Sequence, residues 1–291
     1  MENELPDSSR IKLIATDLDG TLLNEKGRIS EKTKDVIQKI LNKYPDLHFV
    51  LATGRTRLGT IPIREALGIL NRPNTESILS NGCIIYDSNL KELQRNTLPI
   101  DYILKLHNTL KPYPKAIYFC TFEDGMITYD KEWAEKAREM VQENIIIGDK
   151  EEQIKKIESG DSKITKVTYV AAGLDIETIK KIKSQLEELG KEYNLETTNY
   201  SQLIVEYMPS NTNKGTSLNL LMKQLGISKD EVIAFGDGRN DIELLKNVGW
   251  PVVMENARDT LKPYGKIKAK SNVENGVADI LEKIFLKEGV N

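Results

Sequence analysis

Residues 11–21 read Ile-Lys-Leu-Ile-Ala-Thr-Asp-Leu-Asp-Gly-Thr. The first six form an apolar run that ends in turn-forming residues, which predicts a buried strand. Asp17 and Asp19 follow directly, and on an extended chain two residues separated by one point the same way. At the carboxyl end of a parallel strand, both would face the crevice in which α/β proteins bind ligands. One carboxylate could then act as a nucleophile and the other as a general acid/base, or both could hold a divalent cation. The competing interpretation is that Asp and Gly form an ordinary turn after the strand.

The residues after this segment predict a parallel βαβ unit. Ser30 is suited to cap a helix with one apolar face, and Pro45 ends that helix. Residues 48–53 then form a second apolar run. A strand, a helix and a strand at this spacing favour parallel pairing and an α/β fold.

The last third of the chain repeats this pattern. A helix is predicted at 214–225, closed by Gly226, and strands are predicted at 231–236 and 251–254. A closing amphipathic helix is expected at 275–287. Both flanks of the chain therefore indicate the same α/β core.

The middle of the chain mixes hairpin-like strands with longer amphipathic helices. Segments 115–122 and 126–129 flank Glu123-Asp124-Gly125, which is a hairpin turn signal. The simplest organisation is a core built from both flanks with the middle inserted as a second domain. Its predicted parts are a first core part at 1–83, an inserted domain at 84–208 and a second core part at 209–291.

Composition excludes several classes of protein. The 41 basic and 44 acidic residues give a net charge of −3, and residues 84–208 alone hold 17 basic and 22 acidic residues, so we expect no nucleic-acid partner. Two cysteines exclude a disulfide scaffold and a cysteine-rich zinc site, and His107 is expected to be a packed residue. The polar first ten residues and the lack of an apolar run of roughly 18–20 residues predict a cytoplasmic protein without a membrane span.

A second acidic motif, Gly236-Asp237-Gly238-Arg239-Asn240-Asp241, follows the predicted strand at 231–236. Asp237, Asn240 and Asp241 offer oxygen-bearing side chains at a strand end, which suit Mg²⁺. The motif also resembles part of a dinucleotide fingerprint, but the third glycine is missing. The structural alternative is a helix cap.

Three shorter motifs lie at other predicted strand ends and helix starts. Thr53, Gly54 and Arg55 follow the strand at 48–52. Thr53 and the backbone amides could cradle a phosphoryl group, and Arg55 could pair with it. Lys214 opens a helix, where its positive charge opposes the helix dipole. That unfavourable placement is explained if Lys214 faces an anion or carboxylates. Asn81 could bind a ligand at the same rim. Each motif has a purely structural alternative. Thr53 could be a capping residue beside a surface Arg55, Lys214 could be solvated, and Asn81 could belong to a simple Asn-Gly turn.

Taken together and in order, DLDGT, ATGR, SNG, NKG and GDGRND resemble the motifs of the haloacid dehalogenase-like hydrolase superfamily. The sequence is most similar to its Cof-type phosphatases with a large C2 cap, subfamily IIB. The resemblance covers nearly the whole chain. It implies an α/β fold with a Rossmann-like parallel-sheet core and an inserted α+β C2 cap domain.

The resemblance also implies roles for the motif residues. Asp17 would be the nucleophile that forms an aspartyl-phosphate, and Asp19 would be the general acid/base. Residues implied to bind the substrate phosphate are Thr53, Gly54, Arg55, Asn81, Lys214 and Asn240. Those implied at the Mg²⁺ site are Asp17, Asp19 through its carbonyl, Asp237 and Asp241, the last supporting a metal-bound water or Lys214.

The expected function is a Mg²⁺-dependent phosphatase of small phosphorylated metabolites, with sugar phosphates as the expected class. One alternative is a sugar phosphomutase similar to phosphomannomutase, which would return the phosphoryl group to a sugar. A non-catalytic phosphate-sensing module is a further alternative. We expect a small phosphorylated metabolite as the binding partner, and a monomer or a weak dimer.

Overall fold

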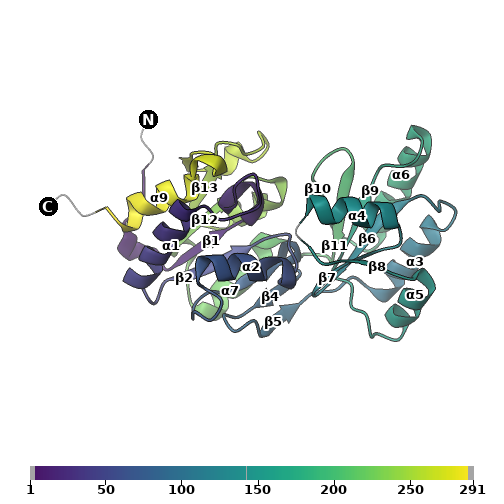
Figure 1. Cartoon of the computed structure of the whole chain (residues 1–291), viewed down its shortest axis with the longest axis horizontal. Coiled ribbons are helices and arrows are strands. Elements are labelled where there is room, and N and C mark those ends of the chain that lie inside the picture. The colour runs from purple at the N-terminus through teal and green to yellow at the C-terminus, as the bar shows by residue number, and fades with distance from the viewer. Residues whose placement is uncertain (1–3, 142, 288–291) are drawn as a thin grey trace. The chain divides into compact units, whose positions relative to one another are not determined.

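The computed structural model of the chain describes residues 4–141 and 143–287 (Figure 1). The chain divides into two compact units. The first takes in the described residues of Met1–Gly54, Thr60–Gln94 and Asn213–Asn291. The second takes in the described residues of Arg55–Gly59 and Arg95–Thr212.

The first unit is built on an eight-stranded sheet in the order β14-β13-β12-β1-β2-β3-β4-β5. Neighbours from β14 to β3 pair in parallel, and β3 pairs antiparallel with β4. The strands are β1 Leu13–Thr16, β2 His48–Ala52, β3 Ser77–Leu79, β4 Ile84–Tyr86, β5 Glu92–Arg95, β12 Val232–Gly236, β13 Trp250–Met254 and β14 Ile267–Ala269.

Helices complete the first unit. They are α1 Glu31–Lys43, α2 Arg57–Leu67 from Thr60 onward, α7 Lys214–Leu225, α8 Ile242–Lys246 and α9 Gly276–Phe285. Every residue of the central strands β1 and β12 is buried, as expected for parallel strands covered on both faces. The carboxyl ends of β1, β2, β3 and β12 consequently lie at one edge of the sheet, where the predicted motifs follow them.

The predicted ends of two helices are confirmed. Ser30 Oγ accepts a hydrogen bond from the Thr33 amide at 3.1 Å and so caps α1, which ends before Pro45. Gly226 ends α7 with φ +68°, a left-handed conformation that glycine adopts without a steric cost.

The second unit has a six-stranded sheet in the order β10-β11-β9-β6-β7-β8, antiparallel except between β7 and β8. Its strands are β6 Ile117–Phe122, β7 Gly125–Thr128, β8 Ile145–Ile147, β9 Lys166–Val170, β10 Glu196–Asn199 and β11 Ile204–Met208. Its helices are α3 Ile100–Leu110, α4 Lys131–Met140, α5 Lys150–Glu158 and α6 Ile176–Glu192. The hairpin predicted around Glu123 and Asp124 is confirmed as the β6–β7 pair.

The limits of the two units differ from those predicted at residues 84 and 208. The change in sequence pattern at Ile84 marks an antiparallel strand, β4, at the edge of the first unit's sheet, and β5 extends that sheet further. The second unit also includes the short segment Arg55–Gly59. Its assignment depends on tertiary contacts, which no local sequence pattern reveals.

Candidate active site

Asp17 stands at the end of β1. Its amide donates to the Phe235 carbonyl of β12 at 3.1 Å, so the strand ladder fixes its backbone. Its side chain is buried, whereas Asp19 is exposed in the turn that follows. The structure thus separates the two carboxylates that the sequence pattern paired: Asp17 lies inside the site and Asp19 at its solvent side.

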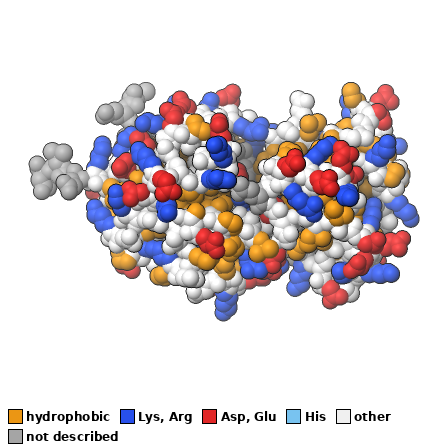
Figure 2. Space-filling model, viewed as in Figure 1, with side chains coloured by type: hydrophobic (Ala, Val, Ile, Leu, Met, Phe, Trp, Pro, Cys, Tyr) orange, Lys and Arg blue, Asp and Glu red, His pale blue; other side chains and the backbone are white. Residues whose placement is uncertain are grey.

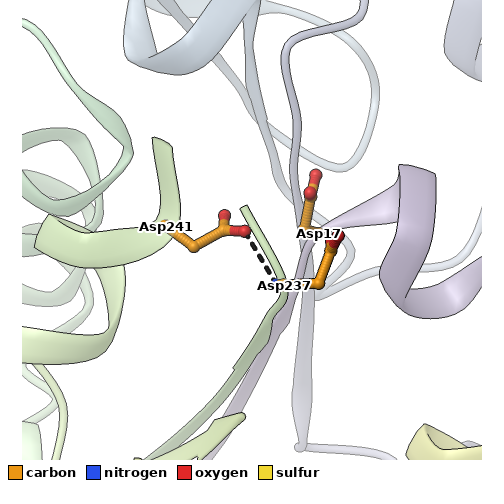
Figure 3. Close-up of side chains that lie close together, drawn as sticks. All are labelled: Asp17, Asp237 and Asp241. Atoms are coloured by element: carbon orange, nitrogen blue, oxygen red, sulfur yellow. Dashed lines mark hydrogen bonds between the residues drawn. The ribbon is translucent and has the colours of Figure 1, made fainter. Parts of the chain in front are cut away.

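Asp241 folds back onto the end of β12. Its Oδ2 accepts hydrogen bonds from the amides of Asp237 (3.1 Å) and Gly238 (2.9 Å), and the first of these is drawn in Figure 3. A side chain at Gly236 would place its Cβ 2.6 Å from that of Asp241. The glycines of the motif thus let the loop close tightly enough to bury the Asp241 carboxylate.

Lys214 is the first residue of α7 and has no exposed surface. The preceding Asn213 caps the helix, and its Oδ1 accepts from the Thr216 amide at 2.9 Å. The Lys214 Nζ lies 2.8 Å from Asp17 Oδ1 and 2.7 Å from Asp241 Oδ1. Lys214 therefore faces two carboxylates, which explains why a lysine is found at the N-terminus of a helix.

Charge and burial set the protonation of this group. Burial lowers the pKa of Lys214, but the Asp17 and Asp241 carboxylates outweigh burial and raise it above its ordinary value, so the ammonium stays charged. Burial raises the pKa of Asp17 well above its ordinary value; Lys214 opposes this shift and the two neighbouring aspartates add to it. Burial, followed by the Asp241 charge, raises the pKa of Asp237 to about 6.

Three carboxylates meet at this strand edge. Ligand oxygens of Asp17, Asp237 and Asp241 lie within 4.8 Å of one another (Figure 3), and within residues 4–141 and 143–287 no other such group of three potential metal ligands is found. One lysine faces three carboxylates, which leaves an excess of two negative charges. Hard oxygen donors with that excess fit a divalent cation such as Mg²⁺.

Two residues that the sequence analysis gave no role orient Asp237. Thr21 donates its hydroxyl to Asp237 Oδ1 at 2.8 Å. Gly20 has φ +78°, and a Cβ there would lie 2.4 Å from Asp237 Oδ2. Both residues end the DLDGT motif, so the motif itself contained the signal from which their roles could have been predicted.

Asn256 also supports this turn and was missed by the sequence analysis. Its Nδ2 donates to the Gly20 carbonyl at 2.7 Å, and its Oδ1 accepts from the Asn272 amide at 3.0 Å. No motif surrounds Asn256, and its role depends on a contact with a residue 236 positions away.

The structure also brings the other rim motifs together. The Asn81 amide donates to the Thr53 carbonyl at 2.9 Å, and Asn81 Oδ1 accepts from Asn240 Nδ2 at 3.0 Å. Ser80 and Asn81 both have positive φ, 50° and 58°, in a turn buried beside the start of α7. Strained backbone of this kind persists only where the surrounding contacts hold it in place.

Arg55 is placed differently from the other predicted residues. The boundary between the units falls between Gly54 and Arg55, and Arg55 is buried in the second unit. There its Nη1 donates to the Gly59 carbonyl at 3.4 Å. Its predicted contact with the substrate phosphate therefore stays a prediction.

His107 lies in the core of the second unit, as expected of a packed residue. Its Nδ1 lies 2.6 Å from the Tyr118 hydroxyl, and burial lowers its pKa to about 4. Burial likewise raises the pKa of Cys120 to about 12, which keeps it an inert thiol. Both residues are therefore buried groups of the second unit, as core packing requires.

Comparison with known proteins decides the family. A family model described as haloacid dehalogenase-like hydrolase matches residues 14–281. The chain belongs to this family. The predicted resemblance, the parallel-sheet α/β core and the hydrolase class are thereby confirmed for this hydrolase.

Several relatives of this hydrolase are similar over nearly their full length. The Bacillus subtilis protein named 5-amino-6-(5-phospho-D-ribitylamino)uracil phosphatase YcsE is 31% identical, over 92% of this chain and 93% of that protein. Another B. subtilis protein of the same activity name, YwtE, is 27% identical over 94% and 98%. A solved structure of a haloacid dehalogenase-like hydrolase from Bacteroides thetaiotaomicron has a TM-score of 0.80 and 26% identity, and it covers 94% of this chain and 100% of its own.

Among the described residues of this hydrolase, no helix is both long and apolar enough to cross a bilayer.

Proposed function

We propose that this hydrolase is a Mg²⁺-dependent phosphatase of small phosphorylated metabolites, with sugar phosphates as the expected class. The observation that carries the proposal is the buried Lys214 ammonium, held 2.8 Å from Asp17 and 2.7 Å from Asp241. A carboxylate that attacks an anionic phosphoryl group must overcome charge repulsion, and a fixed cation beside the nucleophile reduces it.

The proposed reaction has two steps. An Asp17 oxygen forms a bond to phosphorus while the bond from phosphorus to the leaving oxygen breaks, and Asp19 donates its proton to the leaving alkoxide. Asp19 then takes a proton from water, whose oxygen attacks the phosphorus of the aspartyl-phosphate. Inorganic phosphate leaves, and the Asp17 carboxylate and protonated Asp19 are restored. The exposed position of Asp19 suits this exchange of protons with a leaving group and with water.

Mg²⁺ would be held by Asp17, Asp237 and the Asp19 carbonyl. When bound, it supplies positive charge that offsets the charge of the carboxylates and of the phosphoryl group. Asp241 is better suited to a supporting role, because its two oxygens already accept from Lys214 and from two backbone amides. Thr21 holds the Asp237 carboxylate in one orientation.

Two observations support the substrate class. The similar B. subtilis proteins carry a name that specifies a phosphorylated ribityl group attached to a uracil. The second unit offers a separate α+β body between parts of the core sequence, and we assign it the role of a cap that selects the leaving group. Thr53, Gly54, Asn81 and Asn240 are assigned to the phosphoryl group.

The remaining expectations belong to this proposal as well. On the face shown in Figure 2, basic and acidic side chains are intermixed, which supports a small metabolite over a nucleic acid as partner. Cys83 and Cys120 are both free thiols, which suits the reducing cytoplasm. We expect a monomer or a weak dimer.

Phosphate release measured over a panel of sugar phosphates, nucleotides and flavin mononucleotide, with and without Mg²⁺, tests the function. We expect sustained release that needs Mg²⁺, and a loss of roughly 10³-fold or more in Asp17→Asn. Undiminished activity in Asp17→Asn would refute the assignment of the nucleophile. Transfer to a second sugar position without net phosphate release would favour a mutase instead.

A further inference from the structure

The chain enters the second unit for five residues directly after Thr53 and Gly54. This segment, Arg55–Gly59, contains the first turn of α2, whose remainder belongs to the first unit. Its position in the sequence makes it the direct continuation of the loop assigned to the phosphoryl group. Contacts that hold Arg55–Gly59 in the second unit therefore restrict the conformations available to Thr53 and Gly54.

Arg57 is held by the β6–β7 turn. Its Nε donates to Asp124 Oδ1 at 2.8 Å and its Nη2 donates to Asp124 Oδ2 at 2.7 Å, a fork that fixes both groups. Its amide donates to the Glu123 carbonyl at 3.2 Å, and its Nε lies 3.6 Å from Glu123 Oε1. Side chain and backbone of Arg57 are thus held by the same two residues.

Glu123 also holds the next place at which the chain enters this unit. Arg95, the first residue of the longer segment Arg95–Thr212, donates its Nη2 to Glu123 Oε2 at 2.5 Å. The chain passes from the first unit into the second before Arg55 and again before Arg95. The turn between β6 and β7 therefore binds an arginine, Arg57 or Arg95, close to each of these two points.

A second carboxylate binds the same segment from the loop before β8. The Thr56 amide donates to Glu143 Oε1 at 2.8 Å, and the Thr56 hydroxyl donates to Glu143 Oε2. A Cβ on Gly59 would lie 2.6 Å from Glu143 Oε1, so a larger residue there would displace the Glu143 carboxylate. A carboxylate here also lies at the positive end of the α2 dipole.

We propose that Arg57 is a positioning residue for the phosphate loop. Through the Asp124 and Glu123 contacts, and with Thr56 bound to Glu143, it fixes the segment that continues from Thr53 and Gly54. It thereby keeps Thr53 in the conformation that receives the phosphoryl group. This inference rests on the proposed function, because the reaction defines what Thr53 must bind, yet the contacts themselves can be tested without activity.

Hydrogen exchange tests the contacts first, on the full chain without substrate. In Arg57→Gln and Asp124→Asn, we expect faster exchange of the amides from Thr53 to Arg57 than in the wild type, with exchange in β1 and β12 unchanged. Lys136→Gln is the matched control, since it removes a cation from another ion pair of the second unit, with Glu132 at 2.6 Å. Unchanged exchange at residues 53–57 in both variants would overturn the proposal.

Kinetics then separate positioning from a purely structural role. With p-nitrophenyl phosphate and Mg²⁺, we expect kcat to fall roughly 10- to 100-fold in both variants, with KM within about a factor of three, because a displaced group costs rate more than binding. The double variant Arg57→Asp with Asp124→Arg should recover part of the loss. A lowered Tm with unchanged kcat would overturn the positioning role.

The two proposals fail in different ways. A wild-type protein that releases no phosphate from any substrate would contradict the proposed function, and the exchange result would still decide whether Arg57 fixes residues 53–57. Normal wild-type turnover, combined with unaltered kcat in Arg57→Gln, would contradict only the role of Arg57.

Discussion

Replacing Lys214 with methionine removes the buried cation while keeping a side chain of similar length. The Nζ contacts two carboxylates at 2.8 and 2.7 Å with none of its side chain exposed. Removing one partner of a buried ion pair costs about 3–5 kcal/mol of unfolding free energy, because the remaining charges stay buried without compensation. We expect a loss of that size at pH 8 without Mg²⁺.

The loss should shrink as the pH falls. The folded-state pKa of Asp17 is already raised above its unfolded value, so the folded protein takes up a proton there more readily than the unfolded chain does. Such a group adds stability at low pH and loses that contribution as the pH rises through the folded-state pKa. Without Lys214 the pKa of Asp17 rises further, and protonation relieves the uncompensated charge.

Urea unfolding of wild type and Lys214→Met at pH 5 and pH 8, both without Mg²⁺, measures this effect. The matched control is Lys246→Met, which removes an exposed ion pair with Glu243 at 2.7 Å and should cost no more than about 1 kcal/mol. Equal losses in the two variants at pH 8, or a larger loss for Lys214→Met at pH 5 than at pH 8, would refute the reasoning.

Two further predictions concern Asp237. Its pKa in the folded protein is about 6, against an ordinary value of 3.8, so the metal-free protein should lose stability as the pH rises from about 4 to about 7. Unfolding midpoints measured across that range check this loss. The loss should be smaller in excess Mg²⁺, which binds the ionised carboxylate of the folded protein. A flat profile without metal would contradict this. Thr21→Val removes a hydrogen bond that lowers the pKa of Asp237, so Mg²⁺ affinity by calorimetry should fall roughly tenfold; unchanged affinity would exclude the positioning role of Thr21.

The sequence allowed much of the fold to be predicted because its signals are local. The apolar run before Asp17, the Ser30 cap and the Gly226 end each depend on a few adjacent residues, and the structure confirms them. A change in local pattern predicts a domain limit at Ile84, whereas the structure continues the first unit's sheet through β4 and β5. Strand pairing at a sheet edge is a tertiary property that a local pattern does not encode.

The candidate site shows the same division between local and distant signals. Asp17, Lys214, Asp237 and Asp241 follow strand ends or open a helix, and parallel topology brings such positions together. The contact of Arg57 with Asp124 joins residues 67 positions apart. The sequence pattern predicts a hairpin turn at Asp124 and no element at Arg57. Arrangements of this kind become visible only once the fold places the two segments together.

Asp17 is the residue that we propose to carry the phosphoryl group during turnover. With p-nitrophenyl phosphate, whose leaving group needs little protonation, Asp19→Asn should slow mainly the second step. We therefore expect the phosphorylated enzyme to accumulate when this variant is mixed with that substrate and Mg²⁺ and quenched in acid. Borohydride reduction followed by peptide mass spectrometry should then locate homoserine at position 17, and no such product should form when Asp17 is also replaced by Asn. Phosphorylation at another residue, or turnover in wild type with no acyl-phosphate at Asp17, would contradict the claim.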